Sequence, residues 1–209
     1  MALTTYADLQ AAIASWKNNR TDLPAADLIV LAEARLNRDL RLRTMEVDAA
    51  LTAAVGSRRV ALPAGFLEPL ALFLELDDGG RAELRFVAAE LDTHGAAGRP
   101  TRWTVDGGDL AFERPADQAY GLTLRMLQRF GLSDLGPTNA LLTSDPDIYL
   151  AAANIEAALY LMDDEQAVRW QARYADALAS INARDARSRA LTTLSVDPAL
   201  GRRGAVAAG

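Results

Sequence analysis

Residues 144–181, SDPDIYLAAANIEAALYLMDDEQAVRWQARYADALASI, carry two consecutive helix signals. The first is Ser144 followed by Asp145-Pro146-Asp147, which combines a capping residue, a proline and an acidic first turn, as is typical of a helix start. Apolar side chains then recur at steps of three and four residues, which predicts one buried helix face. That face consists of Ile148, Ala152, Ile155, Leu159 and Met162.

A second helix follows almost at once. Asp163-Asp164-Glu165 supplies an acidic first turn, and the same apolar spacing predicts a helix that continues to about Arg189. Such a helix of ~27 residues would be about 40 Å long at 1.5 Å per residue. Because almost nothing joins the two helices, we expect an antiparallel helical hairpin. The apolar positions of the second helix are Ala167, Trp170, Tyr174, Leu178 and Ile181.

Two more helices are predicted near the N-terminus. Thr5 is a candidate cap for the first helix. Pro24 suits the first position of the second helix, with Asp22 as its candidate cap and an end near Arg43. The apolar face of the first helix is Leu9, Ile13 and Trp16. The buried side of the second is Leu28, Ala32, Leu36 and Leu40, or alternatively Leu31 and Arg35.

Between the helical pairs, from about Thr44 to Phe130, short apolar runs alternate with turn signals. Turns such as 77–80 (DDGG) and 106–109 (DGGD) favour antiparallel hairpins, because Asp and Gly accept the positive φ angles that hairpin turns need. The predicted strands are 58–62, 67–76, 81–86, 101–105, 110–113 and 120–130, and a short helix is predicted at 87–93.

The fold class that follows is α+β: terminal helices forming one helical bundle with an inserted, mostly antiparallel β module. We expect residues 1–43 to be the N-terminal helix pair of the bundle, and 44–144 the inserted β module with its connecting segments. Residues 145–190 would be the C-terminal helical hairpin, and 191–209 a flexible C-terminal arm.

Composition excludes several kinds of protein. The chain has 209 residues, half of them hydrophobic, enough for a sizeable core. Its net charge of −6 argues against a primary nucleic-acid binder, which needs a concentrated basic face. The absence of cysteine excludes disulfides and thiolate metal sites. A signal peptide is not expected, because residues 1–15 lack a basic leader and an unbroken apolar stretch, and a membrane span is not expected, because no apolar run approaches ~20 residues.

Candidate chemical groups are few. His94, the single histidine, sits beside Gly95 without a triad pattern, so we expect an ordinary surface residue. The acidic cluster 163–165 is interpreted as complementing a helix dipole rather than as a cation site, and the same holds for Ser144, Asp145 and Asp147. No nucleophile, base and oxyanion donor occur together, so no enzyme activity, cofactor or metal is predicted.

Aromatic and glycine residues are likewise given structural roles. The glycine pairs 79–80 and 107–108 fit neither dinucleotide nor P-loop spacing and are interpreted as turn residues. Trp16, Trp103 and Trp170 are expected to be core anchors rather than a stacking platform.

Charge changes sign near the C-terminus. Residues 145–183 sum to −5, whereas 184–209 sum to +3. One interpretation is a disordered tail, and the other is an arm that orders on a neighbouring subunit or on an acidic partner surface. The basic residues that would dock are Arg184, Arg187, Arg189, Arg202 and Arg203.

Many short segments, taken in order, resemble the head-to-tail adaptor (connector) proteins of podovirus-type bacteriophages, related prophages and gene transfer agents. The resemblance extends to about residue 190, and none of the segments is a catalytic motif. The matching segments are 5–9 (TYADL), 31–41 (LAEARLNRDLR), 45–46 (ME), 62–68 (LPAGFLE), 98–100 (GRP), 107–110 (GGDL), 137–142 (PTNALL), 146–150 (PDIYL), 156–161 (EAALYL) and 163–165 (DDE).

This resemblance implies a structural virion protein at the head–tail junction, made in the host cytoplasm. It implies a homo-oligomeric ring of twelve copies under the portal protein, with the helices facing the portal and neighbouring subunits. The β module would reach the downstream nozzle or tail-tube protein, and genomic DNA would pass through the lumen without sequence-specific binding. An acidic wall suits that passage because it repels phosphate. A ring subunit needs two different complementary surfaces.

Three alternatives remain open from the sequence. One is a different virion ring, such as a tail terminator or head-completion protein. Another is a helical ligand-binding or regulatory domain with the β insert as effector pocket, although no basic recognition helix accompanies it. The third is a hydrolase with a dispersed carboxylate site, although no acid/base pair is recognisable.

Overall fold

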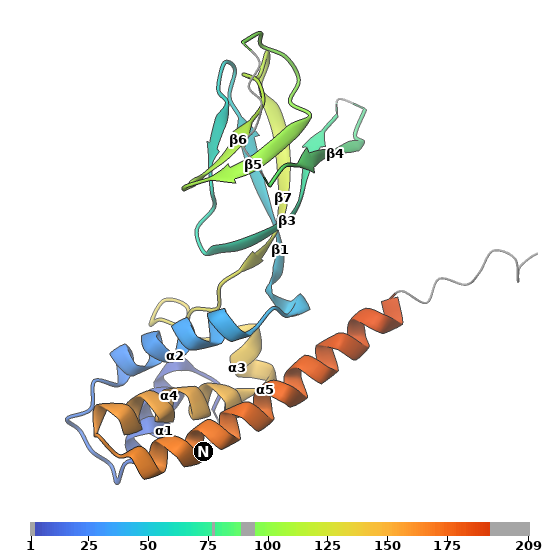
Figure 1. Cartoon of the computed structure of the whole chain (residues 1–209). Coiled ribbons are helices and arrows are strands. Elements are labelled where there is room, and N and C mark those ends of the chain that lie inside the picture. Colours follow the sequence, from blue (N-terminus) through green and yellow to red (C-terminus); the bar gives the residue numbers. More distant parts are fainter. Residues whose placement is uncertain (1–2, 77, 89–94, 193–209) are drawn as a thin grey trace, which may run out of the picture. The chain divides into compact units, whose positions relative to one another are not determined.

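A computed structural model of the chain describes residues 3–76, 78–88 and 95–192 (Figure 1). The described chain divides into two units, a helical unit within residues 1–35 and 145–209 and a β unit of residues 36–144. Helices and a mostly antiparallel sheet confirm the expected α+β class. The elements are α1 (Tyr6–Trp16), α2 (Ala25–Asp39), the 3-10 helix η1 (Arg43–Met45), β1 (Glu46–Ala53), β2 (Arg59–Ala61), β3 (Phe66–Glu75), β4 (Arg81–Phe86), β5 (Arg102–Asp106), β6 (Asp109–Phe112), β7 (Tyr120–Gln128), α3 (Ala140–Ser144), α4 (Pro146–Tyr160) and α5 (Asp164–Thr192).

Helix α1 begins as predicted at Thr5. The Thr5 hydroxyl accepts a hydrogen bond from the Asp8 amide at 3.2 Å, and the Asp8 carboxylate accepts one from the Thr5 amide at 3.0 Å. This reciprocal pair satisfies two N–H groups that the helix itself leaves free. Leu9 and Ile13 are fully buried, whereas Trp16 is 53% exposed, so its predicted place in the core is wrong. Trp16 is the last residue of α1, where the helix leaves the interior.

Helix α2 ends earlier than the predicted Arg43. It ends at Asp39, where the Arg41 guanidinium donates to the carbonyls of Asn37 (2.8 Å) and Leu40 (2.6 Å), which replaces further helical bonds. The Asp22 carboxylate, a predicted cap, is instead bonded to Arg20. The predicted face of Leu28, Ala32, Leu36 and Leu40 is buried, and the alternative face fails because Leu31 is exposed.

Helices α4 and α5 lie side by side in the helical unit (Figure 1). Asp145 occupies the cap position of α4 without a side-chain capping bond, and Ser144 belongs to the short helix α3, which was not predicted. The predicted α4 face is buried at Ile148 and Ile155 but not at its end, where Leu159 is half exposed and Met162 is 90% exposed. Met162 lies in the connecting turn with φ +55°, outside the helical repeat. Helix α5 continues to Thr192, beyond the predicted end near Arg189.

The β unit contains a seven-stranded sheet in the order β1-β7-β3-β4-β5-β6-β2. All neighbouring pairs are antiparallel except β4 with β5, which are parallel over two residues each. The two end strands, β1 and β2, also contact each other, so the sheet is strongly curved. Six strands match the prediction within a few residues, and β1 was missed. Most of the short helix predicted at 87–93 lies outside the described residues, and Val87 and Ala88 are not helical.

One apolar cluster fills the interior of the curved sheet. Trp103 and Phe112 are its most deeply buried aromatic members, and both are 1% exposed. The predicted turn glycines are confirmed where a positive φ is needed, at Gly79 (φ +80°) and Gly107 (φ +63°). Strand β3 has register irregularities against β7 between Phe66 and Glu68 and between Pro69 and Ala71.

Candidate functional site

Of the predicted docking arginines that the structure describes, Arg184 is the one with a two-point ion pair. Its guanidinium donates to both carboxylate oxygens of Asp145, from Nη1 to Oδ1 at 2.9 Å and from Nη2 to Oδ2 at 2.5 Å. This hydrogen-bonded pairing raises the pKa of Arg184. The Asp145 side chain is 11% exposed and that of Arg184 is 56% exposed. The pair therefore fastens the distal part of α5 to the start of α4, a structural role that the sequence did not indicate.

Arg187 and Arg189 lie beyond this fastening, in the last turns of α5. Arg189 donates from Nε to the Asp185 carboxylate at 2.6 Å, one turn away along the same helix. Arg187 is exposed, and its side chain has no partner among the described residues. After Ile181, none of the α5 side chains up to residue 190 is buried. The structure therefore groups Arg184, Arg187 and Arg189 on one exposed helix end, whereas Arg202 and Arg203 lie outside the described residues.

The acidic cluster 163–165 at the start of α5 makes local contacts within the helix. The Asp163 carboxylate accepts a hydrogen bond from the backbone N–H of Gln166 at 3.0 Å, and the Glu165 carboxylate forms an ion pair with Arg169. Within the described parts of the chain, no group of three histidine or carboxylate residues could hold a metal ion. His94 lies outside the described residues.

An aromatic contact joins α1 to α5. The Trp16 and Trp170 rings meet edge to face, with centroids 5.1 Å apart. The Arg173 guanidinium lies 4.9 Å from the Trp170 centroid and 5.9 Å from that of Trp16. Beside them, the buried Lys17 ammonium donates to the Gln166 side chain at 2.7 Å, and burial lowers the pKa of Lys17. The spacing within each helix was visible in the sequence, but the pairing between the helices was not.

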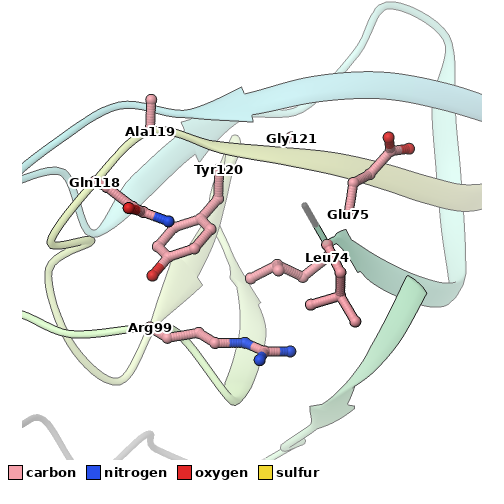
Figure 2. A pocket seen from close by; sticks show the side chains of 8 residues that line it. Leu74, Glu75, Arg99, Gln118, Ala119, Tyr120 and Gly121 are labelled. Atoms are coloured by element: carbon pink, nitrogen blue, oxygen red, sulfur yellow. The ribbon is translucent and has the colours of Figure 1, made fainter. Parts of the chain in front are cut away.

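The β unit contains a cavity of about 380 Å³. Figure 2 shows side chains that line it, among them Arg99 and Glu75. The Glu75 carboxylate accepts from the Thr123 hydroxyl at 2.7 Å. The Tyr120 hydroxyl, also in the wall, donates to Asp117 at 2.7 Å. Among the described residues that line the cavity, none is a histidine, serine or cysteine, and Glu75 is the carboxylate.

Glu113 is a fully buried carboxylate in the β unit. It accepts hydrogen bonds from the Thr101 amide (2.8 Å), the Thr101 hydroxyl (2.7 Å) and the Arg102 amide (3.0 Å). Burial by itself raises the pKa of Glu113, but these bonds to the charged form outweigh it and leave the pKa below its usual range. The Glu113 carboxylate therefore fixes the backbone at the start of β5, which is a structural role.

The described residues thus define an α+β chain in which several ion pairs, such as Arg35–Glu156 and Arg184–Asp145, join different elements. Among the described residues, no helix is long and apolar enough to cross a membrane. Comparison with protein families gives a match to the family described as SU10 adaptor protein over residues 4–197. The chain belongs to the SU10 adaptor protein family, whose members are phage structural adaptors. A comparison with curated proteins gave no match.

Proposed function

We propose that this protein is the subunit of an adaptor ring that joins the portal to the tail of a bacteriophage particle. The observation that carries the proposal is the family match over residues 4–197, which includes both structural units. Its place would be the head–tail junction of the virion, after synthesis in the host cytoplasm. The role is structural, with no catalytic step, cofactor or metal.

The ring would be formed by twelve copies through two different surfaces of each subunit, as closure by rotation requires. Genomic DNA would pass through its lumen. The net charge of −6 supports passage without adhesion, because an acidic wall repels phosphate whereas a basic wall binds it.

Different parts of the chain would meet different partners. The helices of 1–43 and 145–190 would contact the portal and the neighbouring subunits, and the β module of 44–144 would contact the next tail protein. The arm 191–209 would dock on an acidic portal or adaptor surface. Arg187, Arg189, Arg202 and Arg203 are the arginines proposed for that contact; Arg189 pairs with Asp185 of its own helix end, whereas Arg184 is held by Asp145 of another segment.

Two measurements test the ring itself. Mass spectrometry of purified particles should find the protein, and electron cryo-microscopy should locate it as a cyclic ring between portal and tail. A protein that occurs only in the cytosol of infected cells would contradict the proposal. A ring found at the distal end of the tail would instead support a tail terminator.

The docking role of the helix end has a matched control within α5. Arg189→Ala and Arg169→Ala each remove an exposed arginine that is paired with a carboxylate four residues earlier. We expect Arg189→Ala, and Arg187→Ala beside it, to weaken attachment to portal-bearing capsids. Arg169→Ala should leave attachment unchanged, and added salt should weaken attachment of the unmodified chain. Equal attachment of all variants would show that the basic end is not a docking element.

A further inference from the structure

We draw no further inference here: the strongest candidate, the outward face of α5 on which exposed alanines recur from Ala172 to Ala190 with the exposed Asp176 and Arg187 beside them, is a stripe of small residues, and nothing in the structure shows what covers it.

Discussion

Arg184 and Asp145, 39 residues apart in sequence, form a two-point ion pair that joins the distal part of α5 to the first residue before α4. The carboxylate is mostly buried, whereas more than half of the guanidinium side chain is exposed. A residue expected from its charge to dock on another protein therefore has an internal partner.

Arg184→Ala should lower the free energy of unfolding of the helical unit by about 1 kcal/mol, because the pair is bidentate but half exposed. Thermal unfolding followed by circular dichroism at 222 nm would measure the change. Arg187→Ala is the control, since its exposed side chain has no partner in the described structure, and its unfolding temperature should stay the same. Equal effects of the two substitutions would mean that the pair contributes nothing to stability.

Glu113→Gln should destabilise the β unit by roughly 1–3 kcal/mol, because an amide group cannot replace a carboxylate that accepts three hydrogen bonds. Since folding lowers the pKa of Glu113 below its ordinary 4.5, its stabilising effect is present above that value. The effect should be lost as pH falls through the lower, folded-state pKa.

Hydrogen exchange at the Thr101 and Arg102 amides, measured as a function of pH, would follow this loss directly. The exposed Glu83→Gln is the control and should leave both amides protected. Protection in Glu113→Gln equal to that of the unmodified chain would contradict the assigned role.

Asn37→Ala should also weaken the β unit. The Asn37 side chain donates to the Phe130 carbonyl at 2.9 Å and accepts from the Phe130 amide at 2.8 Å. Removing both bonds leaves two poorly solvated backbone groups, at about 1–3 kcal/mol. Asn37→Asp keeps the acceptor oxygen and loses the N–H donor. Its free energy of unfolding should therefore lie between those of the unmodified chain and Asn37→Ala. Chemical denaturation would rank the stabilities of the three proteins. Equal stability of the alanine and aspartate variants would contradict a contribution from both hydrogen bonds.

Met162→Gly should raise stability by about 0.5–1 kcal/mol. Met162 has φ +55°, a left-handed conformation that disfavours residues with a Cβ atom, and its 90% exposed side chain loses little packing. Asn19→Gly is a control at a similar angle, φ +57°, where asparagine is already tolerated and the gain should be smaller. Calorimetry would compare the two, and a less stable Met162→Gly protein would show that the methionine side chain contributes contacts.

The sequence alone determined four of the five described α-helices, six of the seven described strands and the α+β class. Thr5, Pro146 and the apolar steps of α4 and α5 act through residues within one helical turn, so their effects can be read locally. The family resemblance was equally visible, because it lies in the order of short segments.

Tertiary structure alone decided the features that depend on distant partners. The segment 46–53 (EVDAALTA) has a weak strand pattern and becomes β1 because it pairs along its whole length with residues 120–127 of β7. Leu70 is exposed because of its register against β7, and Arg184 is occupied because α5 places it beside Asp145. Each of these outcomes requires chain segments far apart in sequence to meet. The geometry of these meetings is set by loop closure and packing. The spacing of neighbouring residues carries no information about either.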